Sequence, residues 1–125
     1  MTTRAPFSTD IVREGSLVIF KLHGDLDVDG AQTLRNIFES RVESDERNIV
    51  FDLSDVPYIN SAGLGAFILF LKSSNLRAGR IFILNAQNKV KNVFQITSLD
   101  QRLHFIESLE EASKIVSEDN QPQTT

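Results

Sequence analysis

Hydrophobic positions along the chain follow two kinds of spacing. Short apolar runs typical of strands occur at residues 7–13, 17–22, 48–53, 80–85 and 103–106. Between these runs, apolar residues recur every three or four positions, which is the period of a helix with one buried face. The pattern therefore predicts the order β-β-α-β-α-β-α-β-α, with a helix following each strand after the first.

The lengths of the connections predict how these strands pair. The first two runs are separated by a short turn at Glu14-Gly15, which favours an antiparallel hairpin. The runs at 48–53 and 80–85 show little alternation, as expected for strands covered on both faces. Strands that alternate with helices imply right-handed crossovers. We predict one α/β domain with a mixed, mostly parallel sheet, an antiparallel N-terminal edge and about four helices.

Polar residues mark the expected helix ends. Asp29, with Gln32 three residues later, predicts a cap for a first helix whose buried face carries Ala31, Leu34, Ile37, Phe38 and Val42. Ser108 with Glu111 forms a capping box for the last helix. Gly79 stands where it could end the helix expected at 62–76.

The helix at 62–76 has an unusual beginning. Ser61 is placed to cap it, and each of the two glycines that follow, Gly63 and Gly65, costs about 1 kcal/mol relative to alanine. Close approach by another backbone would explain them, and we expect them to leave room for a partner. The predicted inward stripe, which Leu69 and Phe70 widen, consists of Leu64, Phe67, Ile68 and Leu71. Either the helix is buried nearly all round, which we favour, or part of it faces a partner.

The composition fits a single domain at residues 7–117, with a flexible N-terminus at 1–6 and a disordered polar tail at 118–125. No apolar run approaches the roughly 20 residues of a membrane span, and the N-terminus lacks a signal-peptide core. We therefore expect a cytoplasmic protein without membrane partners. The net charge of −4 and the lack of a basic run argue against nucleic-acid binding.

Known catalytic and metal-binding patterns are absent from the sequence. There is no cysteine, and the only two histidines, His23 and His104, are each expected to be structural, so we predict no metal and no cofactor. Ser61 lacks the glycine two residues before it that a nucleophile elbow requires. We predict no catalytic residue. A small hydrolase or transferase that uses Ser61 is an alternative, but no catalytic base stands within an identifiable motif.

Two polar groups remain as candidates for partner contacts. Of the acidic residues after the second strand, we assign Asp29 to capping and leave Asp25 and Asp27 as possible partner contacts. Ser61 is a suitable phosphate acceptor, because amide groups and the dipole at a helix N-terminus stabilise added negative charge. A phosphate there would be tolerated by the fold while it blocks a docked partner.

Four segments together carry a resemblance to a known family: 24–27 (Gly-Asp-Leu-Asp), 49–53 (Ile-Val-Phe-Asp-Leu), 58–65 (Tyr-Ile-Asn-Ser-Ala-Gly-Leu-Gly) and 79–84 (Gly-Arg-Ile-Phe-Ile-Leu). Over about residues 7–117 the chain resembles a STAS domain of the bacterial anti-sigma factor antagonist type. The serine-glycine block at 58–65 is the most specific of the four segments.

The resemblance implies a partner-switching protein. Such an antagonist, while unphosphorylated, binds an anti-sigma factor that is usually also a serine kinase, and so releases a sigma factor. The kinase then phosphorylates the antagonist, and a phosphatase restores it. The phosphorylated residue of the family maps onto Ser61. Its partner surface maps onto Asp25, Asp27, Tyr58, Asn60, Ser61, Ala62, Gly63, Leu64 and Gly65.

Two positions depart from the family pattern. Asn60 replaces the usual acid before the serine, and Ala62 replaces a second serine, which leaves Ser61 as the single acceptor in this block. Because Asn60 lacks the acid's charge, repulsion of a phosphate on Ser61 should be weaker. The departure also supports an alternative, a constitutive or ligand-sensing STAS module that phosphorylation does not regulate. A domain of a sulfate-type transporter is a further alternative.

Overall fold

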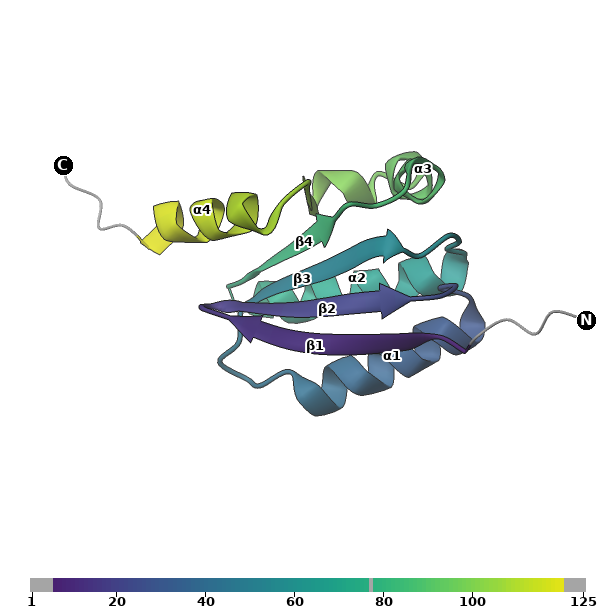
Figure 1. Ribbon diagram of the computed structural model, residues 1–125, viewed down its shortest axis with the longest axis horizontal. Helices are drawn as coiled ribbons and strands as arrows, with labels where there is room; N and C mark the ends of the chain where they lie inside the picture. The colour runs from purple at the N-terminus through teal and green to yellow at the C-terminus, as the bar shows by residue number, and fades with distance from the viewer. Residues whose placement is uncertain (1–5, 77, 121–125) are drawn as a thin grey trace, which may run out of the picture.

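The computed structural model describes residues 6–76 and 78–120 of the chain. The elements follow the predicted order (Figure 1): β1 (Ser8–Glu14), β2 (Leu17–His23), α1 (Val28–Arg41), β3 (Asn48–Asp55), α2 (Ser61–Leu76), β4 (Arg80–Leu84), α3 (Asn88–Ile96), β5 (His104–Ile106) and α4 (Leu109–Asn120). A short 3-10 helix, Leu99–Gln101, stands between α3 and β5. The predicted fold class is confirmed.

The five strands form one sheet in the order β1-β2-β3-β4-β5. β1 pairs with β2 in antiparallel orientation, and every other neighbouring pair is parallel. The predicted edge hairpin and the mostly parallel sheet are therefore both confirmed. The parallel strands all end at the same edge of the sheet, where the loops to the helices begin.

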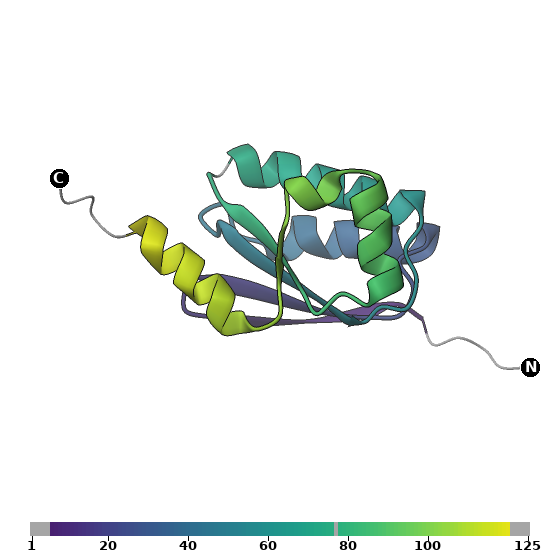
Figure 2. The same cartoon turned by 90° about the horizontal axis from the view of Figure 1, so that it is seen from above.

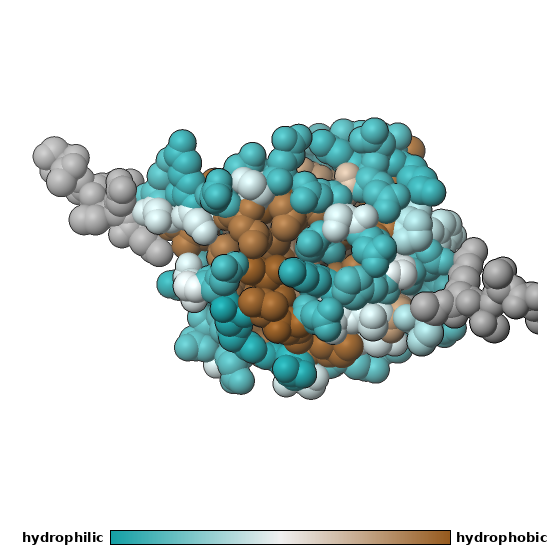
Figure 3. All heavy atoms as spheres, viewed as in Figure 1, coloured by the Kyte–Doolittle hydropathy of each residue, from teal (hydrophilic) through white to brown (hydrophobic). Residues whose placement is uncertain are grey.

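Helices cover the two faces of the sheet unequally (Figure 2). Side chains from α1, α2 and α3 pack with Phe20, Phe51 and Ile83 on one face. On the other face, α4 contributes Ala112 and Val116 to a smaller cluster. Figure 3 shows this second face, with hydrophobic residues gathered over the middle of the sheet.

Phenylalanine rings join the first two helices to the sheet. Phe38 of α1 and Phe70 of α2 stack with their centroids 4.3 Å apart. Phe70 also stacks on Phe51 of β3 at 5.2 Å, and Phe67 meets the same ring edge-on at 5.1 Å. Offset and edge-on contacts of this kind add to the stabilisation from buried area. This ring cluster fixes the position of α2, and with it the position of Ser61.

The first helix begins earlier than predicted. The prediction of Asp29 as its cap is wrong, because Asp27 Oδ1 accepts the hydrogen bond from Gly30 N at 2.9 Å. The backbone before it is held by a hydrogen bond from Leu26 N to Tyr58 O, so the chain can turn into the helix at Val28. Asp29 is an exposed residue of the first turn, and Gln32 donates to Asn36 instead of the cap.

The other predicted helix ends agree only in part with the structure. The capping role of Ser108 is confirmed, since Glu111 N donates to Ser108 Oγ at 3.4 Å. The return bond of the predicted capping box is shifted by one residue, because Glu111 Oε2 accepts from Glu107 N at 3.1 Å. After α2, the left-handed conformation lies at Ala78 (φ 54°), one residue before Gly79. α4 continues to Asn120, so the prediction of a disordered tail is wrong for residues 118–120. Residues 1–5 and 121–125 of the predicted flexible ends lie outside the described residues.

Candidate functional site

Two loops lie side by side where β2 and β3 end. Three backbone hydrogen bonds join the β2–α1 loop (residues 24–27) to the β3–α2 loop (residues 56–60) and to Asp55 just before it: Gly24 N to Asp55 O (3.0 Å), Leu26 N to Tyr58 O (2.9 Å) and Asn60 N to Leu26 O (3.2 Å). Leu26 and Ile59 also form a parallel bridge, and both side chains are buried. The structure thus brings the two predicted partner-binding segments together.

Each loop ends in a side chain that caps the following helix. As Asp27 caps α1, so Asn60 caps α2, because Asn60 Oδ1 accepts from Ala62 N (3.0 Å) and Gly63 N (3.3 Å). The carbonyl oxygen of Asn60 receives the first intrahelical bond, from Leu64 N at 3.0 Å. These are the contacts of a helix N-cap.

Ser61 is therefore the first residue of α2, and the prediction that Ser61 caps this helix is wrong. The hydrogen bond from Asn60 N to Leu26 O keeps Asn60 outside the helix, and this places the cap one residue earlier than predicted. The Ser61 residue is exposed, and the first turn of α2 contains no acidic residue. An anion on Ser61 would meet the positive end of the helix dipole without a carboxylate in that turn.

The two glycines at the start of α2 have different surroundings. A Cβ on Gly63 would lie 2.6 Å from Ile59 Cγ1 and 2.7 Å from Leu26 O, so this glycine permits close packing within the chain itself. The prediction that Gly63 leaves room for a partner is wrong. A Cβ on Gly65 would meet nothing within 4 Å. The fold therefore gives no packing reason for a glycine at position 65.

α2 is buried on one side only. Its inward side chains include Phe67 (0% exposed) and Phe70 (3%), whereas Ile68 and Leu69 are each 40% exposed. The predictions that Ile68 points inward and that the helix is buried nearly all round are wrong. The helix rests on the sheet and packs against α1, and nothing in the described part of the chain covers its remaining side. We call Ser61, Gly65, Ile68, Leu69 and Lys72 the outward face of α2.

The remaining predicted partner residues line the same end of the molecule. Tyr58 is 49% exposed, and Asp25, Asp27, Asn60, Ala62 and Leu64 are half-buried. Asp25 and Tyr58 border a hollow of about 900 Å³ together with His23, Asp55 and Lys89. Asp27 Oδ1 accepts the capping hydrogen bond from Gly30 N, so only the remaining exposed part of this side chain is available to a partner.

The two histidines have opposite environments. His23 lies between two carboxylates, with Nδ1 2.8 Å from Asp55 Oδ2 and Nε2 3.2 Å from Asp10 Oδ2. The hydrogen bonds to Asp55 and then to Asp10 raise the pKa of His23 above its ordinary value. Burial, and then the nearby Arg80, lower the pKa of His104. The His23 contacts could not be predicted from the sequence, because Asp10 and Asp55 are distant from His23 along the chain.

The part of the chain that the structure describes shows no metal site and no membrane span. Among these residues no three His, Cys, Asp or Glu side chains are grouped so that they could hold a metal ion. No helix in the described ranges is both long and apolar enough to cross a membrane.

Comparisons with known proteins agree with this geometry. The family model of the STAS domain matches residues 8–112. The anti-sigma-B factor antagonist of Staphylococcus aureus is 31% identical over 90 residues, which are 72% of this chain and 83% of that protein. The length and identity of this match are sufficient to show a common family.

Solved structures show the same fold. A Thermotoga maritima protein described as a proposed anti-sigma factor antagonist has a TM-score of 0.78 at 27% identity, with 89% of this chain and 94% of that chain covered. The unphosphorylated anti-sigma factor antagonist SpoIIAA has a TM-score of 0.65 at 21% identity, and the match covers 88% of this chain and 98% of that chain. The chain belongs to the STAS domain family and, within it, to the anti-sigma factor antagonists.

Proposed function

We propose that this protein binds an anti-sigma factor while Ser61 is unphosphorylated, so that a sigma factor is released, and that phosphorylation of Ser61 ends the binding. The observation that carries the proposal is the position of Ser61. It is an exposed residue at the start of a helix whose next turns present uncovered hydrophobic side chains.

The outward face of α2 supplies the docking surface. Its residues follow Ser61 at spacings of four, seven, eight and eleven, which place them on one side of a helix. Ile68 and Leu69 are 40% exposed, and Gly65 leaves open space between them and Ser61. Adjacent exposed apolar side chains on one helix face are suited to burial against a protein partner.

Phosphorylation would act locally on this surface. A phosphate adds between about −1.5 and −2 charge units at neutral pH. The N-terminus of α2 stabilises that charge, so the fold is retained. A partner that covers the outward face would have to remove water from the phosphate, and this cost opposes docking. SpoIIAA, which shares the fold, has been solved in a phosphorylated form with a TM-score of 0.64 to this chain, at 20% identity and covering 86% of this chain and 99% of that one.

The enzymes of the switch are partners and not part of this chain. A serine kinase, which we take to be the anti-sigma factor itself, adds the phosphate in the cytoplasm, and a phosphatase removes it. Asn60 supports this step, because its neutral amide caps α2 without placing a carboxylate next to the phosphate. The same amide also motivates the alternative of a constitutive or ligand-sensing module, since a kinase that requires an acid there would not recognise the site.

The test is a capture experiment with the full chain as bait in an extract of its own cells. Wild-type protein, Ser61→Ala and Ser61→Asp are compared side by side, and thermal unfolding confirms that all three are folded. We expect wild type and Ser61→Ala to retain the same protein, and Ser61→Asp to retain at least about tenfold less of it. Equal retention by the two variants would overturn the switch.

A second measurement distinguishes the phosphorylation switch from the constitutive or ligand-sensing module. The captured protein is incubated with the chain and ATP, and the chain is then analysed by mass spectrometry. A phosphate on Ser61 supports the switch. An unmodified chain that still binds its partner supports the constitutive module.

A further inference from the structure

His23 forms a contact that has no part in the proposed switch at Ser61. It is the last residue of β2, and its ring bridges Asp55 at the end of β3 and Asp10 in β1, at 2.8 Å and 3.2 Å. A carboxylate accepts hydrogen bonds, so two carboxylate partners require two N–H donors. Only the protonated imidazole has two, because a neutral ring keeps an acceptor nitrogen that would face a carboxylate oxygen.

The local strand geometry builds this contact. Lys21 of β2 pairs with Asp52, but His23 pairs with Asp55, so β3 contains one extra residue at this point. Such a bulge bends the strand and redirects the residues next to it. Here it places the side chain of Asp55 against the ring of His23.

The contact lies where β2 leads into the β2–α1 loop and β3 leads into the β3–α2 loop. Directly beyond it, Gly24 N bonds to Asp55 O, and the two further hydrogen bonds between the loops lead to Asn60. Asn60 in turn caps α2 and fixes Ser61 as its first residue. The side-chain bridge at His23 thus stands at one end of a series of contacts whose other end is Ser61.

We propose that His23 is a positioning residue for Ser61: its protonated ring ties β1, β2 and β3 together and so holds the β3–α2 loop in the conformation that presents Ser61 and the outward face of α2. Loss of the proton releases one of the two carboxylates and loosens the loop. The effect on the loop stands alone, whereas the effect on partner binding rests on the proposed function.

The direction of the pH dependence follows from the raised pKa of His23. The bridge is complete below the ordinary histidine pKa of about 6.5 and is lost as the pH rises through the raised value, so the change lies above about pH 6.5. Other charged or titratable groups near the ring are Asp25, Tyr58 and Lys89, which border the same hollow, and Lys21 on β2. Variants of the bridge itself therefore have to separate the role of His23 from theirs.

The experiment follows the full chain by NMR from about pH 5.5 to about pH 9. The ring protons of His23 report its titration, which is distinguished from that of His104 because the pKa of His104 is lowered. We expect the amide signals of Leu26 and Asn60 to move with the midpoint of the His23 ring. We also expect their protection from hydrogen exchange, corrected for the intrinsic rate, to fall about threefold to fivefold, as suits an exposed ion pair.

Three variants of the bridge sharpen the test. His23→Arg keeps two donors and a permanent charge, so protection should no longer depend on pH. His23→Gln is neutral and carries both of its N–H donors on a single nitrogen, so it cannot replace the two separate ring nitrogens that contact Asp55 and Asp10, and protection should be low throughout. Asp10→Asn leaves Asp55 as the single carboxylate partner, which a neutral ring can satisfy, so the pH effect should shrink. This variant tests the bridge even if the arginine of His23→Arg does not fit the site.

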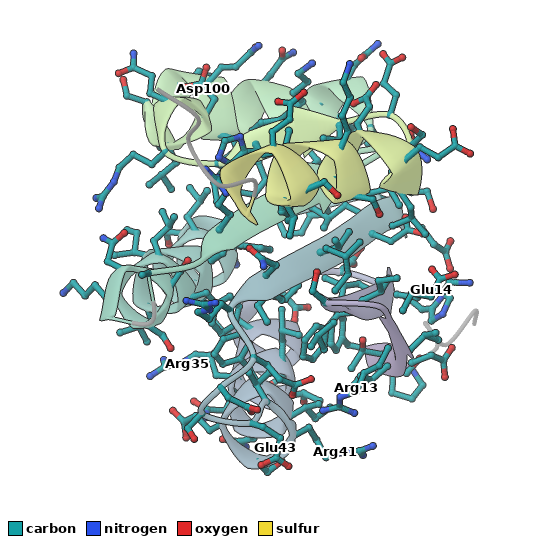
Figure 4. The ribbon with its side chains drawn as sticks, turned by 90° about the vertical axis from the view of Figure 1, so that its left-hand side faces the viewer. Arg13, Glu14, Arg35, Arg41, Glu43 and Asp100 are labelled. Carbon is teal, nitrogen blue, oxygen red and sulfur yellow. The ribbon has the colours of Figure 1, made fainter. Side chains whose placement is uncertain are left out.

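Arg13→Gln is the matched control, because Arg13 pairs with Val18 near the turn of the β1–β2 hairpin, whereas His23 pairs with Ser8 at the other end of the hairpin. Figure 4 shows Arg13 on the side of the molecule that faces left in Figure 1. Arg13 Nε lies 2.7 Å from Glu46 Oε2, and Arg13 also donates to the carbonyl oxygen of Arg41. This variant should leave the pH response of Leu26 and Asn60 unchanged. A His23 ring that titrates without any response in these amides, or wild-type protection in His23→Gln, would overturn the inference.

The outcome is independent of the capture experiment. The amide measurements need no partner, so a failed capture beside a normal amide response counts against the proposed function alone. A successful capture with unresponsive amides counts against the role of His23 alone.

Discussion

The two sides of α2 differ although their residues are neighbours in the sequence. Phe67 and Phe70 are buried against Phe51 of the sheet, whereas Ile68 and Leu69, which lie between them in the chain, are each 40% exposed. All four are large hydrophobic residues, so composition does not distinguish them. The inward side holds the helix in place, and the outward face is the docking surface that we propose. On that proposal, one helix separates stability from binding.

The glycines repeat this contrast within one turn. Gly63 is required because a Cβ would meet Leu26 O and Ile59 Cγ1, and Gly65 lies in open space. Both reduce the intrinsic stability of the helix by a similar amount, about 1 kcal/mol relative to alanine. Packing explains the first glycine, and the proposed partner surface explains the second.

The largest expected effect is on the inward side. Phe67→Ala should lower the free energy of unfolding by about 3–5 kcal/mol, because it removes a fully buried ring that contacts Phe51, Phe70 and Phe94. Urea unfolding followed by circular dichroism measures the loss. A cost no larger than that of Leu69→Ala would contradict the assignment of the inward side.

On the outward face, binding should change more than stability. Ile68→Ala and Leu69→Ala should each weaken capture of the partner by about tenfold to thirtyfold, as for a hot-spot residue, and lower the free energy of unfolding by about 1 kcal/mol or less. Titration of each variant with the captured protein measures affinity. Ile96→Ala is the matched control, because Ile96 is 82% exposed on α3, outside the outward face. Normal affinity in both α2 variants would exclude this face as the docking surface.

Gly63→Ala tests the close packing between the two loops. The new methyl group would overlap a backbone oxygen and a buried side chain, so we expect a loss of about 1–3 kcal/mol in the free energy of unfolding. Thermal and urea unfolding measure it. Gly65→Ala, the same substitution in the same turn, is the control. Equal stabilities of the two variants would show that the contact with Leu26 is not tight.

Gly65→Ala should have the smallest effect on folding and the opposite sign. It should stabilise the protein by about 0.4–1 kcal/mol, since alanine is the better helix former and its methyl group meets no neighbour. The same variant should bind the partner less well if the partner occupies the space at Gly65. Stabilisation with unchanged affinity would leave Gly65 without a role in recognition.

Some features of the fold follow directly from local sequence. The apolar runs and the three- and four-residue spacings predicted every strand and α-helix in order, because both patterns depend only on residues that are close together in the chain. The buried stripe of α1, at Ala31, Leu34 and Phe38, was predicted for the same reason. The block around Ser61 was also recognisable as a strand, a loop and the start of a helix.

The helix caps could not be predicted to the residue. Asp27 and Asp29 are both acceptable caps by their chemistry, and so are Asn60 and Ser61. The choice was made by hydrogen bonds between the two loops, from Leu26 N to Tyr58 O and from Asn60 N to Leu26 O. These contacts join segments that are distant in sequence, and they fix the residue at which each loop turns into the following helix.

By itself, the sequence determined the order of the elements, the mixed sheet and the place of Ser61 at the beginning of α2. Only the tertiary structure decided which side of α2 is buried, that Gly63 serves internal packing, and that His23 bridges Asp10 and Asp55. The physical reason is the range of the interactions. Periodicity is set by adjacent residues, whereas burial, close approach and ion pairs depend on which strands and loops the fold places together.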